Sequence, residues 1–217
     1  MPDDDQGLRS RLVRAGVDLL ARDGEAALTL REIARHAGVS HGAPRRYFPA
    51  HRDLLAAIAR EGYRALAAEV AAALDADHPD PYARVLALAR SYLRFAGAQP
   101  EMFALMFRHD LLRGNAEGLR QASRPLFDTL VGLVAETRPS APPGPPHPVA
   151  VSGSPAGPDR AAAAESVAAA LWANLHGVAQ LSRWGSLQLV LGSDDLDPVL
   201  HAVLDAHLRP AARPPLG

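Results

Sequence analysis

The residues of this sequence that best suit a specific chemical task are two adjacent arginines, Arg45 and Arg46. A guanidinium group donates a planar fork of hydrogen bonds that fits guanine O6 and N7 or a phosphate group. Tyr47 follows them directly, and its neutral hydroxyl can donate to a phosphate oxygen. His41 lies shortly before the pair and either reads a base edge or faces solvent. From these residues alone, the arginines are either an ordinary solvated face or a contact with nucleic acid, and Tyr47 is either a phosphate contact or a buried ring beneath Phe48.

Patterns of catalytic and metal-binding residues do not occur in the sequence. It contains no cysteine, which excludes disulfides, thiolate metal sites and cysteine nucleophiles. The nine histidines form no H-E-x-x-H pair, and Ser154 does not lie in a G-x-S-x-G turn. There is no glycine pattern of a P-loop or a Rossmann fold. The sequence predicts no enzyme, no metal site and no cofactor.

Two short helical segments that meet at a glycine are predicted to position the arginines. Thr29 can cap the first segment, and Glu32 completes a capping box three residues later. Gly38 ends this segment, because a tight turn needs a residue that tolerates positive φ. Ser40 is predicted to cap the second segment, which runs to about Tyr47. The pattern is that of a helix-turn-helix, although any pair of antiparallel helices can mimic it.

The remaining sequence is also predicted to be helical. In a chain of 217 residues with 48% hydrophobic side chains, apolar positions recur at helical spacing, and no stretch alternates like a strand. We expect an all-α fold of about nine helices: a three-helix N-terminal module followed by a larger helical domain. The longer predicted helices cover about 8–23, 53–74, 82–96, 101–112, 119–135, 160–184 and 196–208. Proline, glycine, serine and alanine dominate 138–158, which predicts a disordered surface loop.

Methionine and aromatic side chains recur between residues 95 and 176. A packed core and a ligand pocket explain them equally well. The histidine of this group, His176, is likewise either a hydrogen-bonded core residue or a polar anchor for a ligand. Its members are Phe95, Met102, Phe103, Met106, Phe107, Phe127, Trp172 and His176.

Positive charge is concentrated near the N-terminus, although the whole chain carries a net charge of -1. Residues 6–54 hold nine arginines against five acidic residues, whereas residues 55–217 hold fourteen arginines against sixteen acidic residues. A local basic patch of this kind permits a DNA-binding module on a neutral body. The chain begins with an acidic stretch, and no apolar run approaches the roughly 18 to 20 residues that span a bilayer. We therefore expect a cytoplasmic protein without membrane contact.

An extended motif around the helix-turn-helix resembles the TetR family of transcriptional regulators. The motif reads T-x-x-x-I-A-x-x-A-G-V-S, then G-x-x-x-x-Y-F, then a leucine-rich helix, and the resemblance covers about residues 8–60. The stretch from Trp172 to Gly177 also looks like the Trp…His-Gly signature of one TetR C-terminal subfamily. The motif residues are Thr29, Ile33, Ala34, Ala37, Gly38, Val39, Ser40, Gly42, Tyr47, Phe48, Leu54 and Leu55.

The resemblance implies a helix-turn-helix DNA-binding domain over 6–54 and a ligand-binding and dimerisation domain over 55–217. It implies a repressor that leaves a palindromic operator in double-stranded DNA when an apolar small-molecule effector binds the pocket formed by the aromatic and methionine group. It also implies a homodimer joined through 160–184 and 196–208. The DNA-contacting residues would be Thr29, Ser40, His41, Ala43, Arg45, Arg46, Tyr47 and His51.

Three positions depart from the family pattern. Arg45 replaces the usual tyrosine, and His51 replaces a lysine that commonly touches phosphate. Pro44 would fall just past the first turn of a helix capped by Ser40, where its ring crowds the preceding turn, so we expect a distorted or partly 3₁₀ start. The alternative function is therefore a helical interaction adaptor that has lost DNA binding. A third alternative is a small-molecule carrier or an enzyme of helical fold. The sequence contains no set of catalytic residues that supports an enzyme.

Overall fold

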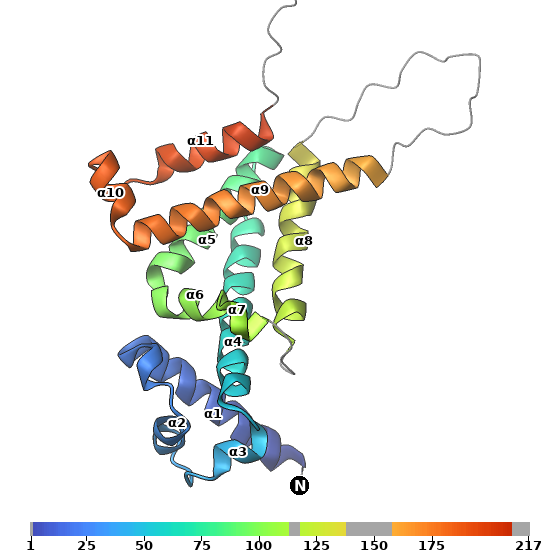
Figure 1. Cartoon of the computed structure of the whole chain (residues 1–217). Coiled ribbons are helices and arrows are strands. Elements are labelled where there is room, and N and C mark those ends of the chain that lie inside the picture. Colours follow the sequence, from blue (N-terminus) through green and yellow to red (C-terminus); the bar gives the residue numbers. More distant parts are fainter. Residues whose placement is uncertain (1, 113–117, 138–157, 210–217) are drawn as a thin grey trace, which may run out of the picture. The chain divides into compact units, whose positions relative to one another are not determined.

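The structure is a computed structural model that describes residues 2–112, 118–137 and 158–209 (Figure 1). This part of the chain contains helices and no strand, which confirms the predicted all-α class. The loop predicted over 138–158 lies outside the described residues, except for Pro158, which begins a helix. None of the described helices is both long enough and apolar enough to cross a membrane.

The helices lie where the periodicity of the sequence predicted them, and the structure contains two short helices more than the prediction. The predicted segment 101–112 is divided at Phe107 and Arg108 into α6 and α7. The six-residue helix α10 was not predicted, because it is too short to show a helical repeat. The elements are α1 (Pro2–Asp23), the 3₁₀ helix η1 (Glu25–Ala27), α2 (Leu30–His36), α3 (Ala43–Tyr47), α4 (His51–Leu74), α5 (Pro81–Ala98), α6 (Pro100–Met106), α7 (His109–Leu112), α8 (Leu119–Thr137), α9 (Pro158–Arg183), α10 (Ser186–Leu191) and α11 (Asp197–Leu208).

The chain forms two compact units. Unit 1 comprises Met1–Glu69 and Arg94–Pro125, and unit 2 comprises Val70–Leu93 and Leu126–Gly217. Helices α4, α5 and α8 each contribute residues to both units. The domain boundary after residue 54 that the sequence suggested stays a prediction.

The core of unit 1 is built where α1 meets α2 and α4. Leu12 and Leu19 of α1 and Ile33 of α2 are fully buried, and Ile58 of α4 is buried with them. Gly16 allows α1 to approach this core closely. A Cβ atom at Gly16 would lie 2.3 Å from the Cδ1 atom of Ile58.

The end of α6 is fastened to other elements of unit 1. The hydroxyl of Tyr63 on α4 donates to the carbonyl oxygen of Met106 at 2.8 Å. Burial raises the pKa of the Tyr63 phenol, so the group stays protonated and can donate. Arg108, just beyond α6, forms ion pairs with Glu25 of η1 and with Asp110.

In unit 2, α11 packs along α9 and is joined to α5 by polar contacts. Leu200, Leu204 and Leu208 of α11 are buried in this unit. The Tyr82 hydroxyl of α5 donates to Asp205 at 2.8 Å. Arg90 of the same helix pairs with Asp197 at the start of α11 and lowers the pKa of that carboxyl group.

We predict that Gly16→Ala destabilises the protein by about 1 to 3 kcal/mol, because the added methyl group must displace the stiff, fully buried Ile58 side chain. Gly132→Ala is the matched control. Gly132 lies inside α8 with nothing within 4 Å of an added Cβ, so alanine should stabilise by about 0.5 to 1 kcal/mol. Urea unfolding of both variants measures the difference, and equal effects at the two sites would contradict the close approach of α1 and α4.

Candidate nucleic-acid interface

The turn between α2 and α3 determines where the predicted DNA-contacting side chains lie. Gly38 adopts φ +66°, which confirms that the turn uses a left-handed residue. The Val39 amide donates to the Ala34 carbonyl at 3.0 Å, as in a Schellman ending. Arg11 of α1 donates to the Ala37 carbonyl at 2.8 Å. The carbonyl groups of Ala34 and Ala37 therefore have partners, and α1 is tied to the turn.

The start of α2 forms half of the predicted capping box. The Thr29 hydroxyl accepts a hydrogen bond from the Glu32 amide at 3.2 Å, so the predicted cap is confirmed. The Glu32 carboxylate does not return the bond. It pairs with Arg35 at 2.7 Å, which lowers its pKa, while the Thr29 amide donates to the Ala27 carbonyl at 2.8 Å.

Helix α3 begins later than predicted, and this accommodates its proline. Its N-cap is Gly42, with no side-chain cap, so the prediction that Ser40 caps it is wrong. Pro44 consequently occupies the first turn of α3, where an N–H group would have no partner within the helix. The distortion expected from a later proline is therefore not required.

The arginines of unit 1 differ in whether they have acidic partners. Arg22 pairs with Asp23, and Arg35 pairs with Glu32. Arg45 and Arg46 on α3 are exposed and make no ion pair with the described residues, and Arg31 on α2 is in the same situation. Arg31 was not among the DNA-contacting residues predicted from the sequence. Its signal was available, because no acidic residue lies three or four positions from it on the helix.

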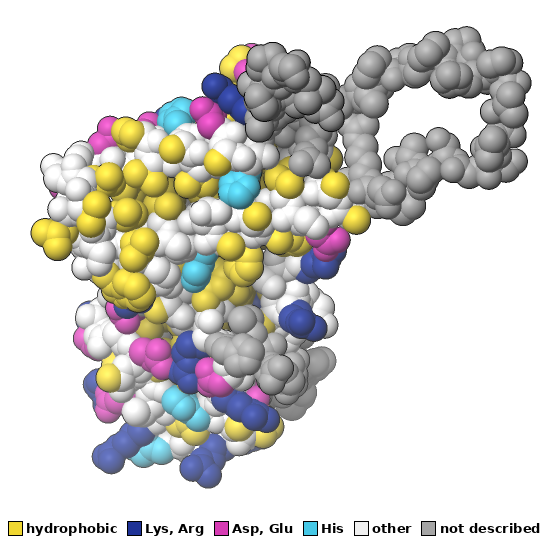
Figure 2. Space-filling view, turned by 45° about the horizontal axis from the view of Figure 1, so that its top comes forward, with side chains coloured by type: hydrophobic (Ala, Val, Ile, Leu, Met, Phe, Trp, Pro, Cys, Tyr) yellow, Lys and Arg dark blue, Asp and Glu magenta, His cyan; other side chains and the backbone are white. Residues whose placement is uncertain are grey.

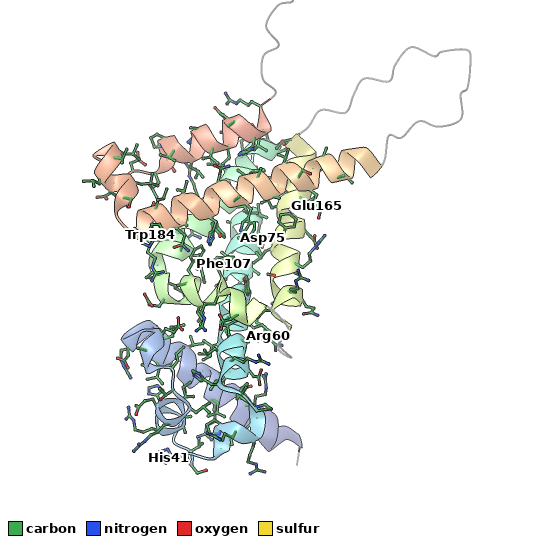
Figure 3. The ribbon with its side chains drawn as sticks, in the orientation of Figure 1. His41, Arg60, Asp75, Phe107, Glu165 and Trp184 are labelled. Carbon is green, nitrogen blue, oxygen red and sulfur yellow. The ribbon has the colours of Figure 1, made fainter. Side chains whose placement is uncertain are left out.

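The other predicted DNA-contacting residues lie in different environments. His41 is exposed in the turn before α3 (Figure 3), and Tyr47 is half-buried at the end of that helix. The Ala43 side chain is only 8% exposed, so it offers little surface to a ligand. The His51 ring hydrogen-bonds to the Leu28 carbonyl oxygen, which holds it against its own protomer.

Five residues of the predicted ligand pocket lie in unit 1 and pack closely. The rings of Phe103 and Phe107 are 4.9 Å apart, and Tyr63 meets Phe107 edge-on at 5.9 Å. The sulfur atoms of Met102 and Met106 would lie 2.7 and 2.6 Å from a Cβ at Gly62. Phe95 is fully buried as well. These contacts are those of a packed core.

The other three predicted pocket residues lie in unit 2, and two of them join a polar cluster. The Tyr92 hydroxyl lies 2.9 Å from Nδ1 of His176, and the Gln180 amide nitrogen lies 3.4 Å from Nε2. The Trp172 ring is 6.1 Å from the imidazole. Burial lowers the pKa of His176. The third residue, Phe127, is half-buried on α8.

Tyr92 and Gln180 were not among the pocket residues predicted from the sequence. The position of Gln180, one helical turn after His176 on α9, was a signal for one of them. The cluster presents a neutral imidazole between two polar partners beside an indole, which suits a ligand with an apolar body and one hydrogen-bonding group.

A recess of about 110 Å³ in unit 1 is too small to be an effector site. It is lined by α1 and by the junction of α5 and α6, including Val17, Gln99 and Glu101. Pockets for drug-sized ligands measure about 300 to 1,000 Å³.

Comparison with known families assigns both parts of the chain. Residues 12–58 match the family described as bacterial regulatory proteins, tetR family. Residues 85–207, more than half of the chain, match the tetracyclin repressor-like C-terminal domain. The chain belongs to the TetR family. It is a DNA-binding regulator of this family, and the resemblance found in the sequence is confirmed.

Solved structures extend this comparison. A protein of unknown function from Rhodococcus sp. RHA1 is 30% identical, with a TM-score of 0.70 over 93% of this chain and 94% of that chain. The TetR-family transcriptional regulator PfmR from Thermus thermophilus is 16% identical, with a TM-score of 0.54 over 94% and 100%. The multidrug-binding protein EbrR, solved with ethidium, is 22% identical, with a TM-score of 0.56 over 93% and 98%. The latter two share the fold. No curated protein matches.

We predict that acid destabilises this TetR-family protein through His176. Because burial lowers its pKa from 6.5, the unfolded chain binds a proton that the folded state resists, so stability should fall as the pH falls below about 7. His176→Gln removes the titration and keeps a polar side chain. Urea unfolding at pH 7 and pH 5 should show a smaller loss for the variant. Identical losses in both proteins would rule out a contribution from His176.

Proposed function

We propose that this TetR-family regulator is a repressor that binds a palindromic operator as a homodimer and leaves it when an apolar small molecule binds unit 2. The observation that supports DNA recognition most directly is the pair of exposed arginines, Arg45 and Arg46, without acidic partners on α3. A guanidinium group without an internal partner retains its full hydrogen-bonding capacity for a base edge or a phosphate.

Helix α3 is proposed to enter the major groove with Arg46 on a base edge and Arg45 and Tyr47 on the backbone. Arg31, exposed in the first turn of α2, is proposed as a further phosphate contact. Thr29, Ser40 and His41 are exposed and stay proposed DNA contacts. Ala43 and His51 are also proposed contacts. Burial of Ala43 and the hydrogen bond from His51 to Leu28 leave these two residues less surface for DNA.

The dimer is proposed to form through α9 and α11. Both helices carry exposed positions that have small side chains and no charge, whereas a solvated helix face normally carries charged residues. These positions are Ala162, Ser166, Ala169, Ala170 and Ala173 on α9 and Ala202 and Ala206 on α11. Leu204 is fully buried within its own protomer, so a charge placed there would test folding instead of the dimer.

The effector is proposed to bind at the polar cluster of Tyr92, His176 and Gln180, with Trp172 against its apolar body. The neighbour EbrR was solved with ethidium, a planar aromatic cation, which provides a first probe with a flat aromatic body. For the other predicted pocket residues, contact with the effector stays a prediction. These residues are Phe95, Met102, Phe103, Met106, Phe107 and Phe127. The adaptor alternative relied on Pro44, whose place in the first turn of α3 no longer favours it.

We predict that Arg46→Ala costs about 1 to 3 kcal/mol of binding to the operator and much less on scrambled DNA, because a base contact carries the sequence information. Tyr47→Phe should weaken both duplexes equally and leave the salt dependence unchanged, because it removes no charge. Arg45→Ala should flatten the slope of log affinity against log salt by about one unit.

The measurement is a titration of the DNA upstream of the protein's own gene and of a scrambled duplex at several salt concentrations. Circular dichroism confirms that each variant is folded. Arg22→Ala is the matched control, since Asp23 already neutralises this arginine. Wild-type affinity in all three α3 variants would remove α3 from the groove, whereas a wild-type protein that binds neither duplex would favour the adaptor.

The two tryptophans allow a direct test of the effector site. In a Trp184→Phe variant, Trp172 is the sole tryptophan, and we predict that ethidium quenches its fluorescence in a saturable manner because the ligand lies against the indole. His176→Ala in that background should weaken the binding about tenfold, the effect of losing one polar contact. Quenching that does not saturate, or that ignores His176, would place ethidium elsewhere.

A further inference from the structure

The long helix α9 has no charged side chain over most of its length. Residues 166–182, about five helical turns, contain no aspartate, glutamate, arginine or lysine. Figure 3 labels Glu165 and Trp184, which lie just beyond the two ends of this stretch. The polar cluster at His176 lies within it. The charges on either side, Glu165 and Arg183, are at least about 10 Å from His176 along the helix axis, and each already has an interaction within the chain.

Charged residues on the neighbouring helices have partners of opposite charge. On α5, Arg90 and Arg94 each lie two positions from Tyr92, which turns them to a different side of the helix. Arg90 pairs with Asp197, and Arg94 pairs with Glu69 at 3.3 Å. Both acidic residues of α11 are paired, and α10 has no charged residue. In Figure 2, hydrophobic side chains gather over unit 2 on the face in view.

The polar groups of the cluster are neutral and can both donate and accept hydrogen bonds. Burial lowers the pKa of His176, so its imidazole stays uncharged near neutral pH, with one N–H donor and one acceptor nitrogen. The Tyr92 hydroxyl and the Gln180 amide are likewise donors and acceptors. The distance of 3.4 Å from the Gln180 amide to Nε2 is long for a hydrogen bond, so this contact is the one that a ligand replaces most easily.

This environment favours a neutral ligand over a charged one. None of the described residues that form the cluster carries a charge, and a carboxylate or an ammonium group that leaves water without an opposite charge loses much free energy. The indole of Trp172 attracts a cation through its face, but this side chain is 40% exposed, and a single exposed contact of this kind is weak. A neutral carbonyl, hydroxyl or ring nitrogen needs only the hydrogen bond that the cluster supplies.

We propose that the effector is an uncharged molecule, with a flat apolar body against Trp172 and one neutral oxygen or nitrogen that hydrogen-bonds to His176 in place of Gln180. Permanent cations and carboxylates are outside this class. This rests on the effector site of the proposed function and adds the charge class of its ligand.

Four probes that share a flat three-ring frame separate charge from shape. Phenanthridine has one neutral ring nitrogen that accepts a hydrogen bond, and phenanthrene has no polar atom. The 5-methylphenanthridinium ion is a permanent cation, and phenanthrene-9-carboxylate is an anion at pH 7.5. Each probe is titrated into the full-length Trp184→Phe protein, in which quenching reports binding at Trp172, the sole tryptophan.

Phenanthridine should bind most tightly. Phenanthrene should bind about tenfold more weakly, the effect of one lost hydrogen bond, and both charged probes at least about tenfold more weakly. Ethidium shares the frame and is a cation, so it should fall in this weaker range. His176→Ala should abolish the preference for phenanthridine over phenanthrene. His201→Ala is the matched control and should leave the order unchanged, because its ring hydrogen-bonds to the Asp197 carbonyl of its own helix.

The outcomes separate the charge class from the effector site, with circular dichroism as the check on folding. A charged probe that binds as tightly as phenanthridine, and is weakened by His176→Ala, would overturn the neutral class and leave the effector site in place. Phenanthridine quenching that does not saturate, or that ignores His176→Ala, would overturn both. Phenanthridine that binds as expected but does not release the DNA would contradict the proposed function and support the neutral class.

Discussion

The direction of α3 depends on the backbone at Gly38. With φ at +66°, the chain leaves α2 along a path that side chains with a Cβ rarely adopt, and the bond from the Val39 amide to the Ala34 carbonyl closes it. Arg11 adds the link to α1 by donating to the Ala37 carbonyl. The helix that carries Arg45 and Arg46 is therefore in contact with α2 and α1, and α1 is in turn buried against α4.

The arginines of unit 1 fall into two groups, according to whether an acidic residue lies beside them. Arg22 and Arg35 are neutralised by acidic residues on their own helices and contribute little attraction for an anion. Arg31, Arg45 and Arg46 have no such neighbours, so their charge remains available to a phosphate backbone. The net charge of -1 of the whole chain is therefore a poor guide to its partner, and the local distribution is a good one.

The helix positions and the Thr29 cap were predictable because they depend on local periodicity and local hydrogen bonding. Three features were not. Ser40 has the chemistry of a cap, but the turn extends to Gly42, and only the tertiary path shows this. Helix α10 is defined by its flanking glycines and not by a repeat. Tyr92 meets His176 across 84 residues, a pairing that no local pattern encodes. The predicted aromatic group mixed two environments because sequence alone does not separate the packed cluster at Phe103 from the polar cluster at His176.

Protection of guanine N7 from methylation by dimethyl sulfate tests the central claim most directly, namely that α3 lies in the major groove of DNA. N7 is exposed only in that groove. We predict two clusters of protected guanines in the DNA upstream of the protein's gene, about one helical turn or a multiple apart, as two heads of a dimer would give. Binding of this DNA without any change in N7 reactivity would contradict the account.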